Sequence, residues 1–224
     1  EGSVMTVVTA PIGPAAPAAL DHARRDRVTF LTVPERCYLA VDGCERPGGQ
    51  TFQNAIATLY PIAYTLHFAL RRAGVPAPIG MLEGLFWLAP EDVMDEEPVA
   101  PNTERTGSWS WRLLIPIPEP ATEEDVERAV RDAAERKTLP ALSRFHVLRW
   151  EEGPSAQLLH VGPYSAERRT IARLTEAIAA AGLEPHGPHH EIWLNNPSQV
   201  GEDKARTIIR LAVRPRAASI EGRP

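Results

Sequence analysis

The sequence has little that would point to a secreted, membrane-spanning or nucleic-acid-binding protein. Its two cysteines, Cys37 and Cys44, are too few for a disulfide framework and lack the paired spacing of a zinc site. No apolar run approaches the roughly 20 residues that a membrane-spanning helix needs. Lysine and arginine form no long cluster, and the formal net charge is −5, which disfavours contacts with phosphate backbones. We therefore expect a reduced, cytoplasmic protein that binds neither nucleic acid nor membranes.

The 224 residues fit one large domain or two small ones, and the 22 prolines lie mostly at the start of the chain and between periodic segments. Residues 1–27 show no periodicity and are expected to form a flexible leader. Residues 1–4 and the tail 214–224, which contains a sequence like a protease-cleavage linker, resemble additions to a natural chain. The fold is expected to occupy residues 28–213.

Within that range, strand-like and helix-like segments follow each other in an order that occurs twice. The longest helix is predicted over 51–73, where apolar residues recur at spacings of four and three. An acidic, proline-containing stretch over 90–107 is expected to be a surface loop beside a site. The other expected elements are strands over 28–33, 36–41, 81–88, 109–117, 145–150, 157–161, 189–194 and 207–213, and helices beginning at 122 and 165.

The repeated order predicts an α+β fold built by pseudo-two-fold duplication of a strand-helix-strand-strand module. The modules are expected at about 28–138 and 139–213. They would form an antiparallel, curved sheet with helices on one side and a central ligand cleft.

A glutamate interrupts each of two similar apolar strands, Glu83 in the first module and Glu191 in the second. A charge in such a run is costly unless it is paired or directed at a ligand. The repeat predicts that the two carboxylates converge on one cleft, where one can be ionised while the other holds a proton. Aromatic side chains are expected to line this cleft for a flat aromatic ligand, neutral or cationic. They are Trp87, Trp109, Trp111, Trp193 and Tyr164.

Each of these residues also has a purely structural interpretation. The two glutamates could be solvent-facing at strand edges, and the tryptophans could belong to the core. Tyr164 follows Gly162-Pro163 and could serve only to cap a turn. The His-Gly-Pro-His-His-Glu run ending at Glu191 invites a metal site, but no distant ligand set accompanies it. We therefore expect neither a metal nor an organic cofactor.

Several short motifs, in this order, resemble the GyrI-like small-molecule-binding family, in particular its stand-alone members. In the first half they are Asp42-Gly43, Ala55 to Tyr60, Ala63 to Leu66 and Leu82 to Trp87. In the second half they are His160-Val161-Gly162-Pro163-Tyr164, Thr170 to Leu174, His189 to Pro197 and Lys204 to Arg210. The chain departs from the family pattern at His67, where we expect lysine, and at the turn Cys44-Glu45-Arg46-Pro47.

The resemblance implies a pocket between two modules, in which Glu191 corresponds to the acidic residue that recognises cationic aromatic drugs. Some stand-alone members hydrolyse the cyclopropane ring of DNA-alkylating cyclopropanoid antibiotics. That activity would assign catalysis to Glu83, Glu191 and Tyr164. Substrate binding would fall to the tryptophans Trp87, Trp109, Trp111 and Trp193 together with Phe86, Tyr64, His160 and His190.

Two main functions therefore follow from the sequence. The first is a hydrolase that protects the cell by opening such a ring. The second is a non-catalytic module that sequesters or senses a hydrophobic drug. A protein-interaction role such as topoisomerase inhibition is a weaker third. The protein is expected to act as a monomer or a homodimer.

Overall fold

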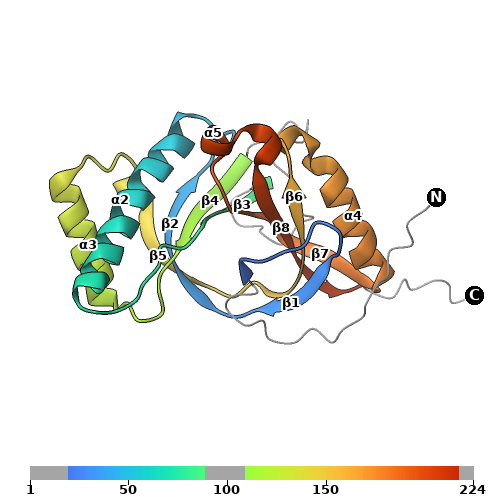
Figure 1. Cartoon of the computed structure of the whole chain (residues 1–224), viewed down its shortest axis with the longest axis horizontal. Helices are drawn as coiled ribbons and strands as arrows, with labels where there is room; N and C mark the ends of the chain where they lie inside the picture. The colour runs from blue at the N-terminus through green and yellow to red at the C-terminus, as the bar shows by residue number, and fades with distance from the viewer. Residues whose placement is uncertain (1–19, 89–108, 217–224) are drawn as a thin grey trace, which may run out of the picture.

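The computed structural model describes residues 20–88 and 109–216. Its strands form one eight-stranded antiparallel sheet in the order β1-β6-β8-β7-β3-β4-β2-β5 (Figure 1). The strands are β1 (Thr29–Val33), β2 (Arg36–Gly43), β3 (Leu82–Leu88), β4 (Trp109–Pro116), β5 (Phe145–Trp150), β6 (Gly153–Val161), β7 (Leu183–Trp193) and β8 (Arg206–Pro215). The helices are α2 (Gln50–Arg72), α3 (Glu123–Arg136), α4 (Glu167–Ala180) and the short α5 (Pro197–Val200), with 3-10 turns η1 (Leu142–Arg144), η2 (Tyr164–Ala166) and η3 (Glu202–Lys204).

The strand order is symmetric about the central contact between β7 and β3. Outward from that contact come β8 and β4, then β6 and β2, and finally β1 and β5. The first half of the chain runs β2-α2-β3-β4, and the second runs β6-α4-β7-β8. Each half also adds a strand to the outer edge of the other half, since β1 pairs with β6 and β5 with β2. The predicted α+β class with an antiparallel sheet is confirmed.

The long helices α2 and α4 cover the same face of the sheet, which we call the helix face. Directly paired residues of neighbouring antiparallel strands lie on one face. One such row crosses the four central strands and continues onto β6: Leu113, Gly84, Glu191, Ile209 and Leu158. Leu113 packs in the core with α2, and Leu158 and Ile209 pack with α4. We call the other side of the sheet the opposite face.

Helix α2 forms because its apolar residues recur along one stripe that packs on the sheet. Phe52, Leu59, Ile62 and Leu66 are buried in this stripe. The helix ends at Arg72, and Gly74 follows with φ +78°, a conformation that glycine adopts without strain. The sequence prediction of 51–73 is therefore correct to within one residue at each end. Among the helices of residues 20–88 and 109–216, none has the length and apolar composition needed to cross a membrane.

The opposite face is partly covered by residues 20–27, which the sequence assigned to a flexible leader. Leu20 and Ala23 are buried, and Leu20 packs with Leu31 and Val33. Backbone carbonyls in this segment accept hydrogen bonds from Arg210 and Gln157. The expectation that the fold begins at Val28 is therefore wrong for this segment. The predicted loop at 90–107 and residues 1–19 lie outside the described residues.

Candidate functional site

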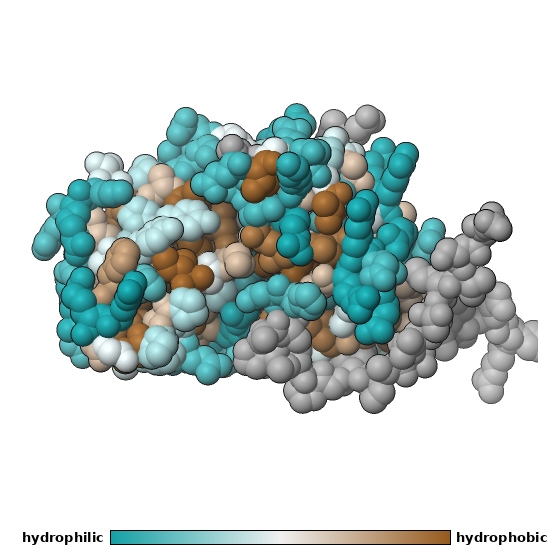
Figure 2. Space-filling view, in the orientation of Figure 1, coloured by the Kyte–Doolittle hydropathy of each residue, from teal (hydrophilic) through white to brown (hydrophobic). Residues whose placement is uncertain are grey.

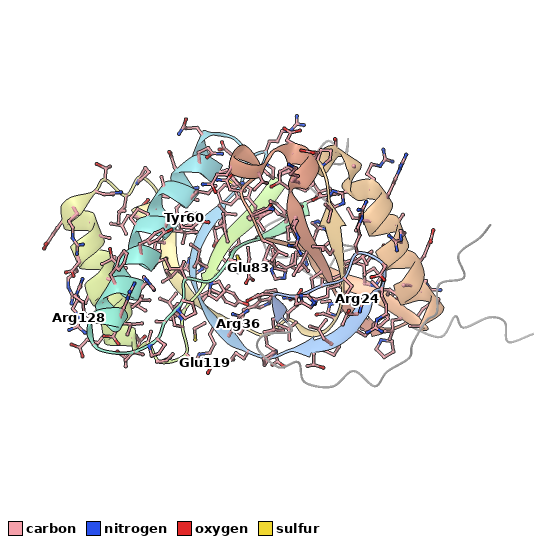
Figure 3. All side chains as sticks on the ribbon, in the orientation of Figure 1. Arg24, Arg36, Tyr60, Glu83, Glu119 and Arg128 are labelled. Carbon is pink, nitrogen blue, oxygen red and sulfur yellow. The ribbon has the colours of Figure 1, made fainter. Side chains whose placement is uncertain are left out.

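Glu83 and Glu191 lie on opposite faces of the sheet, so the expected convergence of these carboxylates does not occur. Strands β3 and β7 are paired, but the cross-strand partner of Glu191 is Gly84, and the partner of Glu83 is Ile192. Consecutive residues of a strand point to opposite faces. Glu191 therefore faces the helices, while Glu83 faces away from them (Figure 3). A one-residue offset between the two similar stretches is enough to separate the two carboxylates.

On the helix face, Glu191 is buried and held by two neighbours from its own strand. The indole N–H of Trp193 donates to Glu191 Oε2 at 3.0 Å, and His189 Nε2 lies 3.2 Å from Glu191 Oε1. Glu191 is 3% exposed. Residues i and i+2 of a strand share a face, so β7 itself supplies both partners. Glu191 is thus oriented by two ring nitrogens at the centre of the sheet.

An aromatic cluster surrounds this carboxylate. Phe86 lies beside both His189 and Trp193, with ring centroids 6.4 and 6.2 Å away. Phe52 of α2 meets Trp193 edge-to-face at 6.3 Å and Trp111 at 5.0 Å. Such edge-to-face packing is favourable for aromatic rings. The floor beside Glu191 is therefore aromatic and low in polarity.

The second carboxyl group of this site is Glu167, at the start of α4, which the sequence analysis did not single out. Glu167 is buried, and burial together with the charge of Glu191 raises the pKa of its carboxyl to about 10. Tyr164 lies three residues earlier, in η2. Burial, and after it the charges of Glu191, Glu167 and Glu202, raise the pKa of its hydroxyl. Two carboxyl groups and a phenol therefore interact on one face.

The raised pKa values leave Glu167 and Tyr164 protonated at neutral pH, beside the Glu191 carboxylate. A carboxyl with a pKa near 10 is protonated at neutral pH and can donate a proton, as can the neutral phenol of Tyr164. Glu191 lies within hydrogen-bond distance of two ring nitrogens, His189 Nε2 and the donating Trp193 Nε1. Tyr164 is 39% exposed and forms the accessible part of the group. Glu167 or Tyr164 can therefore donate a proton to a bound molecule, and the Glu191 carboxylate can accept one from it.

The other aromatic residues predicted to line the ligand site do not contact the Glu191 carboxylate and lie in three different parts of the fold. Trp109 and Trp111 lie on the helix side in the core around α2, and the Trp111 indole N–H donates to the Glu45 carbonyl at 2.9 Å. Trp87 lies on the opposite face with Leu85 and is separated from Glu191 by the sheet. Tyr64 has its ring neighbours on the outer side of α2. Of the tryptophans, only Trp193 contacts the Glu191 carboxylate.

Two predicted histidines also have defined partners. His160 is buried, with Nδ1 2.9 Å from Thr170 Oγ1 and Nε2 3.2 Å from the Pro163 carbonyl. It therefore anchors α4 and the segment that leads into Tyr164. His190 faces away from Glu191 because it is the next residue along the same strand. Its ring belongs to a second polar group on the opposite face.

On the opposite face, His190 lies between two carboxylates. Its Nε2 is 3.1 Å from Glu83 Oε2, and its Nδ1 is 3.1 Å from Glu152 Oε2. Arg210 Nη1 donates to the same Glu152 oxygen at 3.4 Å, and Arg210 Nε donates to Gln157. All five side chains are buried. We call Glu83, His190, Glu152 and Arg210 the buried ion network.

The charges of this network stabilise one another. The carboxylates of Glu152 and Glu83 raise the pKa of His190 despite its complete burial, which opposes the charged form. His190 and Arg210 in turn hold the pKa of Glu152 below its usual value against the effect of burial. Arg36 Nη1 lies 3.8 Å from Glu83 Oε1 (Figure 3). Each ring nitrogen of His190 has a carboxylate partner, whereas Glu83 Oε1 and Arg36 Nη1 are buried without a hydrogen bond in the described part of the chain.

Three residues of these two polar groups, Glu152, Arg210 and Glu167, have only weak signals in the sequence. Glu152 falls between the predicted strands 145–150 and 157–161, whereas β6 already begins at Gly153. Arg210 stands inside the apolar strand 207–213, where a charge is as conspicuous as at Glu83. Glu167 lies in the first turn of a helix, a position where acids are usually exposed. Among the described residues, no three metal-ligating side chains gather into a metal site.

Residues 115–214 match the model of the GyrI-like small-molecule binding domain. An uncharacterized conserved protein from Listeria innocua is 30% identical, with a TM-score of 0.77 over 91% of this chain and 100% of that one. No curated protein matches the sequence.

Two further structures from Listeria innocua are described as hydrolases. The first is 29% identical with a TM-score of 0.73, and covers 91% of this chain and 100% of its own. The second is 28% identical with a TM-score of 0.73, and covers 91% and 99%. The similarity thus extends across both halves of the chain.

Proposed function

Because the chain belongs to the GyrI-like small-molecule binding domain family and is similar over 91% of its length to hydrolases, we propose that it is a cofactor-independent hydrolase. Its substrates are DNA-alkylating cyclopropanoid compounds, in which a cyclopropane ring is fused in spiro fashion to a dienone. Opening this ring with water removes the alkylating group and protects the cell.

The reaction adds one water molecule. The water oxygen attacks the cyclopropane methylene while Glu191 accepts a water proton. The strained carbon–carbon bond breaks, and its electron pair moves through the dienone to the carbonyl oxygen. That oxygen becomes a phenolate and takes a proton from Glu167 or Tyr164. The product is a hydroxymethyl phenol, and the proton taken by Glu191 returns to the donor through solvent.

The observation that carries this proposal is the electrostatic coupling of Glu191 and Glu167 beside an aromatic floor. Burial, and after it the charge of Glu191, raises the pKa of Glu167 to about 10. A protonated Glu167 is therefore available as a proton donor on the same face as the Glu191 carboxylate. Positioned acid–base groups contribute about 10²–10⁴-fold in rate, which suffices for a substrate that is already strained.

A second candidate function is binding without chemistry. The family is described as a small-molecule binding domain, and a carboxylate in aromatic surroundings suits a cationic aromatic drug. In that case Glu191 would act as a counter-charge and Glu167 would have no proton to deliver. The two functions differ in whether the bound compound changes.

The test is to incubate the protein with a spiro-cyclopropyl dienone and to follow the product by liquid chromatography and mass spectrometry. The proposal predicts a ring-opened product that has gained one water, formed faster than in buffer alone. Tight binding with no product above the uncatalysed rate would assign the protein to the second function.

The matched control is Glu176→Gln, which removes a carboxylate from an exposed position of the same helix as Glu167. This variant should turn over at the wild-type rate, whereas Glu167→Gln should be slowed. Equal rates in the two variants would remove Glu167 from the reaction.

A further inference from the structure

A groove between α2 and α3 lies outside both polar groups described above. Its volume is about 400 Å³, within the range of small-molecule sites. Three aromatic side chains of α2, Tyr60, Tyr64 and Phe68, line it. They follow one another at intervals of four residues and therefore lie along one side of the helix. Figure 3 labels Tyr60 on α2, where its side chain is half-buried.

The aromatic residues form a continuous but incompletely covered ladder. Tyr60 and Tyr64 have ring centroids 6.2 Å apart, as do Tyr64 and Phe68, with interplanar angles of 35° and 27°. Tyr64 is 48% and Phe68 47% exposed, among the largest exposures of apolar side chains in the described chain. Figure 2 shows apolar surface around α2, with hydrophilic side chains along the edge of the molecule that α3 forms. Exposed aromatic surface of this kind marks binding sites.

The charges along the groove all have one sign. Arg72 of α2, Arg136 of α3 and Lys137 line it, and no carboxylate of the described residues does. Of these three cations, Arg136 forms an exposed ion pair outside the groove lining, with its Nη2 3.4 Å from Asp132 Oδ2. Burial raises the pKa of Tyr60, so this phenol adds no negative charge. The groove is therefore basic in a chain whose net charge is −5.

We propose that this groove is a second small-molecule site that binds flat aromatic anions. The rings stack on the Tyr60–Tyr64–Phe68 ladder, and the anionic group is held by the guanidinium and ammonium groups of Arg72, Arg136 and Lys137. This site is independent of the proposed hydrolysis, because none of its lining residues belongs to the helix-face group around Glu191 or to the buried ion network.

The charge pattern separates this ligand from other occupants. A cationic drug would gain from the aromatic rings but would be repelled by three neighbouring cations. A two-fold dimer through this groove would place the same basic patch against itself. Three cations on an acidic chain are also too few for a nucleic acid. An aromatic anion satisfies both the ladder and the charges.

The experiment compares 2-naphthoate with 2-naphthamide, which has the same ring system and no charge, by isothermal titration calorimetry. At low salt, naphthoate should bind at one site and more tightly than the amide by at least about threefold. The difference in affinity between naphthoate and the amide should shrink at 0.5 M salt. The Debye length is then only about 4 Å, so exposed charges attract the carboxylate less. Equal affinities at low salt would overturn the proposal.

Variants then locate the site. The double change Arg136→Gln with Lys137→Gln, and separately Tyr64→Ala, should each weaken naphthoate by about threefold or more. The control Arg128→Gln removes an exposed cation from the same helix outside the groove (Figure 3), and it should leave affinity unchanged. Loss of naphthoate binding in Glu191→Gln but not in the double variant would place the ligand at the helix-face site instead. A dimer that the double variant converts to monomers would assign the groove to a second copy. Either result contradicts the proposal.

Discussion

Gly84, and not Glu83, is the cross-strand partner of Glu191 at the centre of the sheet. The absence of a side chain at Gly84 leaves room for the Trp193 indole, whose N–H holds the Glu191 carboxylate. The adjacent Glu83 is thereby directed to the other face, where it binds His190. One register thus assigns Glu191 to the proposed site and Glu83 to the buried ion network.

Replacing Gly84 by alanine should disturb this register contact. The added Cβ would lie 2.6 Å from Trp193 Cη2 and 2.8 Å from the Phe86 ring. Overpacking of this kind costs about 1–3 kcal/mol, so we expect the free energy of unfolding in urea to fall by that amount. Turnover should also fall, because the indole that orients Glu191 must move. Wild-type stability in Gly84→Ala would contradict the packing described for Trp193.

The Glu167→Gln variant should be more stable than the wild type but slower. The folded-state pKa of Glu167 is about 10 against an ordinary value of 4.5. Between these values the folded protein binds the extra proton, so wild-type stability declines as pH rises. An amide removes this penalty, and the free energy of unfolding at pH 8 should rise by on the order of 1–3 kcal/mol.

The gain should disappear at pH 4, where the carboxyl is largely protonated in both states. Denaturant unfolding at pH 4 and pH 8 measures the difference. A variant that is less stable than the wild type at pH 8 would show that Glu167 is ionised in the folded protein.

His190 should stabilise the fold at low pH and lose this contribution as the pH rises, whereas Glu152 should lose its contribution as the pH falls. Its folded-state pKa is raised above the ordinary 6.5, so its contribution is fully present below about 6.5 and is lost as pH rises through the raised value. The pKa of Glu152 is lowered from 4.5, so its contribution is present above that value and is lost as pH falls through the lowered one.

Removing His190 leaves two carboxylates without their shared partner, and His190→Gln should cost about 3–5 kcal/mol near neutral pH. The gap between the wild type and this variant should narrow as the pH is raised, because neutral histidine no longer pairs with the carboxylates. Urea unfolding of both proteins at a series of pH values between 6 and 9 tests this. A gap that widens with pH would contradict a charged His190.

The sequence was sufficient for the elements whose formation is local. The stripe from Phe52 to Leu70 determines helix α2, and the helix appears within one residue of its predicted bounds. Glu191 was recognisable because a carboxylate inside an apolar strand requires a partner. These conclusions depend on periodicity and desolvation, which are properties of short segments.

Tertiary pairing decided what the sequence could not. The similar stretches around Glu83 and Glu191 predict equivalent positions, but the register between them is set by the β3–β7 pairing. Because side chains alternate along a strand, an offset of one residue places the two carboxylates on opposite faces. The pKa of Glu167 is raised because the fold buries its carboxyl and, as a second cause, because α4 brings it near the charge of Glu191. Glu152 and Arg210 meet His190 through the pairing of β6, β7 and β8.

The division of labour between the two central glutamates is tested most directly by measuring kcat/KM for ring opening in Glu191→Gln and Glu83→Gln, alongside the wild type. We predict that Glu191→Gln loses about 10²-fold or more and stays folded. In Glu83→Gln, kcat/KM should fall by less than about tenfold, because the proposed acid–base groups stay intact. Its melting temperature should fall. A large loss of turnover confined to Glu83→Gln, with Glu191→Gln fully active, would place the chemistry on the opposite face and contradict this account.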